Sequence, residues 1–296
     1  MDHRAFLATL TAAQRRQLTA KSNRRGLAHL AGHAGAIGLV AALILAGTPG
    51  WPLLMVVQGV LVIFLFTLLH ETVHQTAFRS ARLNQAVGYA CGFAVLLPPI
   101  WFRFFHLAHH RHTQDPDHDP ELAQAKPQSL ARYIVYVSGV PVWAAQLGAL
   151  ARNACGRCTD RFVPPSRRAK VHNEARLMVA AYAALLGICL AFGFTALLYV
   201  WLLPLLLGQP FLRLFLLAEH GRCPYVANMF ENTRTTYTSW LVRKLTWNMP
   251  YHAEHHAYPT VPFHRLPQLH TLARDHLRRT EAGYAQFHAK YIDSLD

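Results

Sequence analysis

Long apolar stretches separated by polar segments predict a helical membrane protein. Helices need about 20 apolar residues to cross roughly 30 Å of hydrocarbon. Four stretches approach or exceed that length, at residues 29–47, 51–69, 177–200 and 202–218. The fourth is short and contains Pro204, Gly208 and Pro210. A turn from Gly47 to Gly50 separates the first two stretches and predicts a tight hairpin.

Two further apolar stretches, 86–102 and 131–150, contain residues that interrupt helices. The first contains Pro98 and Pro99, and the second contains Gly139 and Pro141. Because proline removes a backbone donor and blocks continuation of a helix, neither stretch is expected to cross the membrane as one straight span. We expect both to be interfacial or re-entrant.

Composition and charge support a membrane location and give it an orientation. Of the 296 residues, 52% are hydrophobic and 15% are charged, against roughly 25% charged in soluble domains. The formal net charge is +14, and basic residues gather before the first and third apolar stretches. The connectors 47–51 and 199–203 carry no charge. The positive-inside rule therefore places the N-terminus, residues 70–176 and the C-terminus in the cytoplasm.

The distribution of the basic residues corresponds to the positions of the membrane spans, so we expect no nucleic-acid partner. They are not interleaved with aromatic residues as in a platform for stacking bases. A docking surface for an acidic redox partner is compatible with them. The five cysteines are odd in number, which favours a reducing compartment without disulfides. Cys155 and Cys158 have CxxC spacing but no second pair, so no metal or redox role is expected there.

Eight histidines form three short clusters, and their spacing predicts a metal site. Imidazole is neutral near pH 7 and is the commonest metal ligand among side chains. Residues three or four positions apart share one helix face, whereas adjacent residues diverge by about 100°. The clusters can therefore chelate two neighbouring ions, which predicts a dinuclear site. They are HETVH with His70 and His74, HLAHH with His106, His109 and His110, and HAEHH with His252, His255 and His256.

Polar residues near these clusters are expected to support them rather than to bind metal. His112 and His118 add two imidazoles, and the aspartates can hydrogen-bond to ligand imidazoles. Glu71 and Glu254 are expected to orient imidazoles or face solvent. The segment 231–236, ENTRTT, is interpreted as a solvated loop or a contact for a substrate headgroup. The three aspartates are Asp115, Asp117 and Asp119.

The clusters must share one side of the membrane to form one site, which requires an even number of spans between them. The predicted fold is therefore an all-α integral membrane protein with four transmembrane helices in two hairpins, interfacial or re-entrant helices and a cytoplasmic histidine-rich cap. One domain is expected over residues 1–296. It comprises a cytoplasmic segment 1–28, membrane hairpins 29–218 with a cytoplasmic insert 70–176, and a cytoplasmic part 219–296.

In this order, the three clusters resemble the HxxxH, HxxHH and HxxHH histidine boxes of the membrane fatty acid desaturase superfamily. The resemblance covers most of residues 29–270. It implies two non-haem iron ions held by the eight clustered histidines, with O₂ as co-substrate and hydrogen abstraction from an unactivated C–H bond. It also implies a ninth ligand at the end of the last span, where His220 stands 32 residues before His252.

The leading hypothesis is a fatty acid desaturase of a bacterial inner membrane, acting on a membrane lipid or acyl substrate. We expect a ferredoxin-like electron donor, because the chain shows no dinucleotide-binding glycine motif and no haem or iron–sulfur domain. The alternatives within the enzyme class are a lipid hydroxylase and a carotenoid ketolase or hydroxylase. A non-enzymatic metal-binding or transport protein is the alternative of another class, for which ionisable residues near the middle of the spans are expected.

Overall fold

The computed structural model describes residues 1–295, which are mostly helical. Four helical segments are long and apolar enough to cross a membrane, as the sequence predicts. The first contains α2 (Ala12–Leu18) and α3 (Asn23–Leu45), and the second contains α4 (Trp51–Ile63) and α5 (Leu65–Val73). The third contains η2 (Pro165–Arg167) and α10 (Arg168–Ala191). The fourth contains the π-helical turn η3 (Leu198–Leu202) and α11 (Leu203–His220).

The two interrupted apolar stretches form bent helix pairs, so neither is one straight span, as expected. Helices α6 (Ala81–Ala94) and α7 (Pro99–His112) meet at 99°, with Pro98 and Pro99 at the bend. Helices α8 (Leu130–Val137) and α9 (Val140–Ala154) meet at 51°, and Gly139 at that bend has a φ of 75°. Both bends follow from residues that end one helix and start the next.

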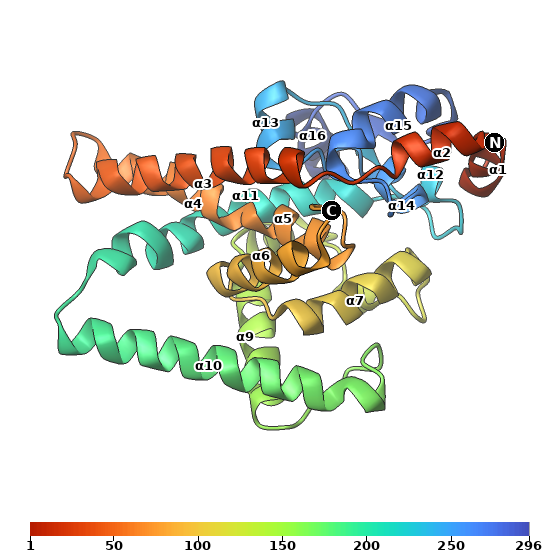
Figure 1. Ribbon diagram of the computed structural model, residues 1–296. Helices are drawn as coiled ribbons and strands as arrows, with labels where there is room; N and C mark the ends of the chain where they lie inside the picture. The colour runs from red at the N-terminus through yellow and green to blue at the C-terminus, as the bar shows by residue number, and fades with distance from the viewer. Residues whose placement is uncertain (296) are drawn as a thin grey trace.

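The first hairpin has the predicted turn, whereas the second turns before residues 199–203, the predicted connector, which are helical instead. Gly47 and Gly50 both have positive φ, at 63° and 82°. Helix α10 ends at Ala191, where Gly193 has a φ of 61° and the Phe194 amide donates to the Cys189 carbonyl at 2.8 Å. The apolar stretch 177–200 therefore runs past the end of the helix. Helix α10 packs on α9 and α7 rather than along α11 (Figure 1).

Within residues 1–295, helices α4 and α11 make the most extensive contact between two helices, and two glycines make this contact possible. A Cβ atom on Gly59 would lie 2.1 Å from the Pro204 carbonyl oxygen. A Cβ atom on Gly208 would lie 2.1 Å from the Gly59 carbonyl oxygen. The two backbones thus touch directly, as small residues allow in membrane helix pairs.

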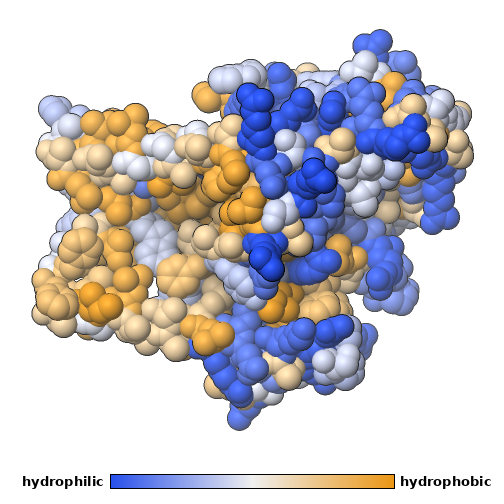
Figure 2. Space-filling view, viewed as in Figure 1, coloured by the Kyte–Doolittle hydropathy of each residue, from blue (hydrophilic) through white to orange (hydrophobic). Residues whose placement is uncertain are grey.

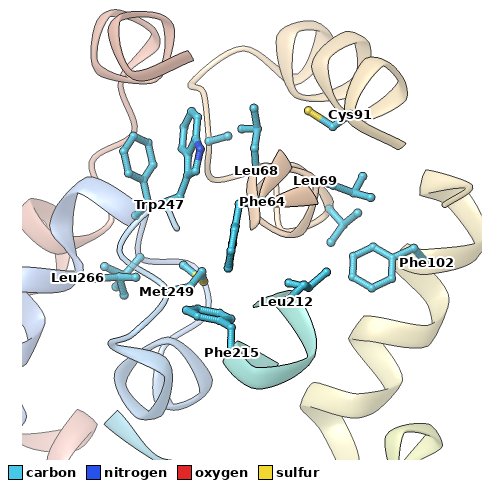
Figure 3. Close-up of a cluster of buried hydrophobic side chains, with 14 of the residues drawn as sticks. Phe64, Leu68, Leu69, Cys91, Phe102, Leu212, Phe215, Trp247, Met249 and Leu266 are labelled. Atoms are coloured by element: carbon cyan, nitrogen blue, oxygen red, sulfur yellow. The ribbon is translucent and has the colours of Figure 1, made fainter. Parts of the chain in front are cut away.

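An apolar core lies where these helices approach the histidine-rich end (Figure 3). Phe64, at the junction of α4 and α5, packs edge to face on Phe215 of α11 with ring centroids 5.3 Å apart. Trp247 is fully buried, and its indole N–H donates to His33 of α3 at 3.3 Å. The core therefore joins both membrane hairpins to the segment that precedes the third histidine cluster.

The remaining elements form a cap at one end of the spans. Figure 2 shows that hydrophilic residues gather over this end, whereas the opposite half of the visible face is apolar. Phe6 of the first helix packs on Phe230 with ring centroids 5.4 Å apart, so the N-terminal segment closes the cap. The elements are α1 (His3–Thr9), η1 (Pro120–Ala123), α12 (Met229–Asn232), α13 (Trp240–Leu245), α14 (His252–Ala257), η4 (Phe263–Arg265), α15 (Leu266–Ala273), η5 (Arg274–His276), α16 (Tyr284–Asp293) and the parallel strands β1 (Thr235–Thr236) and β2 (Thr280–Glu281).

The Gly59→Ala variant should be less stable because the added methyl group would meet the backbone of α11. Overpacking of this kind lowers the free energy of unfolding by about 1–3 kcal/mol. Thermal unfolding of the purified protein in detergent measures the effect. The matched control is Gly38→Ala on α3, where a Cβ atom would meet nothing within 4 Å. Equal stability of the two variants would show that the α4–α11 contact is not closely packed.

Candidate metal centre

All nine histidines expected at the site lie together where the spans meet the cap. His70 is on α5, and His74 is the residue that ends this helix. His106, His109 and His110 are on α7, and His220 is the last residue of α11. The short helix α14 carries the third cluster. Because α5 and α11 deliver their histidines from membrane spans, the site lies where the spans meet the cap.

The nine side chains form two neighbouring groups. In the first group, one ring nitrogen from each of five residues lies within 4.8 Å of the others. The second group brings together His109, His220 and His256 under the same distance limit. His252 joins the second group, since its Nε2 lies 3.2 Å from Nε2 of His220. The five residues of the first group are His70, His74, His106, His110 and His255.

The ring nitrogens fit metal ligation and are otherwise poorly satisfied. Neither ring nitrogen of His70, His110 or His255 has a hydrogen-bond partner within residues 1–295. Leaving a buried polar atom without a partner is unfavourable, and a metal ion would satisfy these nitrogens. Two nitrogens bound to one ion at about 2.1 Å lie roughly 3 to 4 Å apart. The His109 and His220 Nε2 atoms, 3.2 Å apart, match that spacing.

Hydrogen bonds from the outer ring nitrogens orient the second group. Nδ1 of His109 donates to Asp119 Oδ1 at 2.9 Å, and Nδ1 of His220 donates to the Asn232 carbonyl at 3.2 Å. The Thr113 hydroxyl donates to the His109 carbonyl at 2.8 Å, so it accepts from His256 Nδ1, 3.1 Å away. In each residue Nε2 is left free to bind a cation, as is typical of histidine ligands.

Asp119 makes the contact expected of the aspartates, whereas Asp115 and Asp117 make none with the nine histidines. Asp115 instead lies 2.9 Å from His118 Nδ1 at the surface, and Asp117 is exposed. His112 and His118 also remain outside the two buried groups. The distinction follows from the turn after α7, which directs Asp119 inward and the other two aspartates outward.

Three expectations for nearby polar residues are wrong. Glu71 is buried and accepts from the Phe263 amide at 3.1 Å, so it fixes the segment after the third cluster rather than an imidazole. Glu254 is also buried and binds Thr235 and His270, a histidine outside the clusters. The segment 232–236 is buried within the cap and is not a solvated loop.

Glu121 and Lys126 are charged residues beside the second group that spacing alone does not indicate. Lys126 forms an ion pair with Glu121, whose other carboxylate oxygen lies 3.4 Å from His109 Nε2. Burial raises the pKa of Glu121, but Lys126 and His109 outweigh this effect and hold it below its ordinary value. Glu121 and Lys126 lie shortly after the second histidine cluster in the sequence, but only the fold shows that they face the second group of histidines.

Burial keeps most of these imidazoles in the neutral form that binds metal. It lowers the pKa of His110, His255 and His256 well below the ordinary value, with a further decrease from neighbouring histidines. His109 is different, because Glu121 and Asp119 outweigh burial and raise its pKa. A raised pKa means that His109 binds a proton more readily beside the carboxylates of Glu121 and Asp119. A metal ion bound to His109 would replace that proton.

A cavity of about 420 Å³ adjoins the histidines on the membrane side. His70, His106, His109 and His252 form part of its wall. Apolar side chains of α4, α5, α7, α9 and α11 form one part of the remaining wall. The polar part comes from Glu121, Gln124, Lys126, Gln146, Arg152, Asp160, Gln209, Arg213 and Glu219. An apolar chain can therefore lie beside the histidines along the apolar part of this wall. Apolar wall residues include Ile63, Phe66, Val95, Phe102, Phe105, Leu212 and Phe215.

The four spans and the two histidine groups define an integral membrane protein with a histidine-rich centre at one end of its helices. The family model described as fatty acid desaturase matches residues 47–288, which include all nine histidines. The chain belongs to the fatty acid desaturase family.

Curated relatives are similar across most of this chain. A chloroplastic omega-3 fatty acid desaturase of Glycine max is 26% identical over 73% of this chain and 52% of its own length. A sphingolipid delta(4)-desaturase of Drosophila melanogaster is 28% identical over 70% of this chain and 60% of its own. An endoplasmic-reticulum acyl-lipid omega-3 desaturase (cytochrome b5) of Arabidopsis thaliana is 24% identical over 83% and 70%, respectively. The chain spans about half the length of the Glycine max relative.

Replacing Asp119 by alanine should weaken metal binding, because His109 would lose the acceptor that orients its ring. Loss of such a contact typically lowers metal affinity by about 10- to 100-fold. Competition between the purified protein and a chelator for Fe²⁺ measures this affinity. Asp117→Ala is the matched control, since that side chain is exposed on the same turn. Equal affinities in the two variants would exclude the proposed role of Asp119.

Proposed function

We propose that this protein is an O₂-dependent, di-iron membrane oxidoreductase that desaturates a fatty acyl substrate. The observation that carries the proposal is the convergence of nine histidines into two groups beside an apolar cavity. Membership of the fatty acid desaturase family supports the same reaction class. The names of the three relatives add support for an acyl or sphingolipid substrate.

The ligand set proposed for the two iron ions follows the two groups of ring nitrogens. His70, His74, His106, His110 and His255 would hold one ion, and His109, His220, His252 and His256 would hold the other. When bound, the two non-haem irons would supply O₂ activation and abstraction of hydrogen from an unactivated C–H bond. Asp119, Thr113 and the Asn232 carbonyl orient His109, His256 and His220, respectively, each through the Nδ1 atom of the imidazole.

The cavity would position the acyl chain and restrict water. His70 and His106 are part of the same wall as Phe66 and Phe102, so a methylene group in the cavity lies next to the ligand residues. Excluding water protects a strongly oxidising centre from side reactions. A chain drawn from the bilayer would keep its apolar part in the membrane half of the protein and its reacting carbons beside the cap.

The electrons would come from a separate protein. Reduction of O₂ to two waters takes four electrons, and desaturation supplies only two of them from the substrate. We propose a ferredoxin-like donor that docks on the cap, and we place the cap on the cytoplasmic face of a bacterial inner membrane, in line with the distribution of basic residues. The name of the Arabidopsis relative includes cytochrome b5, so cytochrome b5 is the second electron donor to test.

Expression in a host of defined lipid composition should yield acyl chains that have lost two hydrogens. Mass spectrometry of the extracted lipids separates this product from a gain of oxygen, which would indicate hydroxylation, and from altered carotenoids. His255→Ala and His109→Ala should abolish the product without preventing membrane insertion, because each removes one proposed ligand. His276→Ala is the control outside both groups. Full activity of either ligand variant would remove that residue from the proposed set.

Turnover by the purified, iron-loaded protein should require a reduced electron donor. Reduced ferredoxin is expected to support product formation, whereas O₂ alone is not, because two electrons would be missing. Product analysis with ferredoxin, with cytochrome b5 and with neither protein measures this requirement. Product formed at the full rate with no reductant would contradict an external donor.

A further inference from the structure

A third group of side chains of metal-ligating types lies on the surface, outside the nine clustered histidines. Ring nitrogens of His112 and His118 and a carboxylate oxygen of Asp115 all lie within 4.8 Å of one another. The three residues follow the spacing HxxDxxH at the end of α7 and in the turn that follows. Two imidazoles and one carboxylate form a common ligand set for divalent transition-metal ions.

Distances within this surface triad are close to those that one ion requires. Asp115 Oδ2 lies 2.9 Å from His118 Nδ1 and 3.8 Å from His112 Nδ1. Two ligands bound tetrahedrally at about 2.1 Å are roughly 3.4 Å apart, which falls between these two distances. The other carboxylate oxygen of Asp115 accepts from the Asp117 amide at 3.0 Å, which orients Oδ2 towards the imidazoles. The side chains are partly exposed, so water can fill the remaining ligand positions.

The turn that carries the surface triad also supports the second buried group. Gln114 has a φ of 62°, an unfavourable value for a residue other than glycine. The backbone N–H of Gln114 donates to Asp119 Oδ2 at 2.8 Å, and its side-chain Nε2 donates to the His220 carbonyl at 2.9 Å. The Asp119 amide in turn donates to the Asp115 carbonyl at 2.9 Å. The turn thus links the triad to Asp119, which holds His109, and to His220.

We propose that His112, Asp115 and His118 bind one divalent transition-metal ion such as Zn²⁺, and that the bound ion stiffens the turn 113–119. This surface site is separate from the buried centre and does not depend on the reaction proposed there. An ion bridging the end of α7 and the turn would restrain the backbone that holds Asp119 against His109. An ion bound to the surface triad would therefore restrain Asp119 and, through it, His109, although the triad contributes no ligand to the buried centre.

Calorimetric titration of the full-length, iron-loaded protein with Zn²⁺ tests the site. The wild type should bind one Zn²⁺ ion, and the affinity of His118→Ala for Zn²⁺ should be at least tenfold lower. Asp115→Asn should also bind more weakly, although it keeps an oxygen for the Asp117 amide. His276→Ala is the matched control and should behave as wild type. Identical binding by wild type and His118→Ala, or release of one iron for each Zn²⁺ bound, would overturn the proposal.

Hydrogen exchange of the backbone amides in residues 114–119 tests the effect on the turn. Zn²⁺ should slow exchange of these amides in the wild type and leave it unchanged in His118→Ala. The His118 side chain is largely exposed, so its loss should leave the fold and the iron content intact. Exchange that Zn²⁺ does not slow in the wild type would overturn the coupling between the surface triad and the turn.

Discussion

The rest of the structure depends on holding nine imidazoles together where little water reaches them. An imidazole nitrogen that loses water and gains no partner costs about 1–3 kcal/mol, so such a cluster is stable only if something binds its nitrogens. The helices are arranged around this requirement. Two membrane spans end at His74 and His220, and α7 and α14 carry the other histidines. The apolar core beneath them, from Phe64 to Trp247, fixes these ends relative to one another.

Local patterns in the sequence predict those features that depend on a few consecutive residues. Hydropathy identifies the four spans, and Pro98, Pro99 and Gly139 identify the two bends. Helical spacing identifies the histidines that converge. Hydropathy does not identify the end of α10, because apolar residues flank Gly193 and make this turn as apolar as the helix. The polar character of 232–236 is equally misleading, since these side chains find partners inside the cap.

The contacts that orient the imidazoles could not be predicted in full, for a physical reason. His220 donates to the backbone carbonyl of Asn232, and a carbonyl group is present at every residue and so leaves no mark in the sequence. Thr113 acts through one hydroxyl that donates to one histidine and accepts from another. Such roles depend on how segments far apart in the chain are placed. Asp119 is predictable only as one of three nearby aspartates, and the direction of the turn selects it.

Because Gly59 and Gly208 are in direct contact, a change in helix orientation at this contact would move the end of α11 that carries His220. His220 lies twelve residues after Gly208, which corresponds to about 18 Å along the helix axis. A tilt of about 5° at the glycines would therefore displace His220 by roughly 1.6 Å, if the helix moves as a rigid rod. That displacement is comparable to the length of a metal–nitrogen bond. The geometry of the clustered histidines is thus set in part by two residues without side chains that lie outside the metal centre.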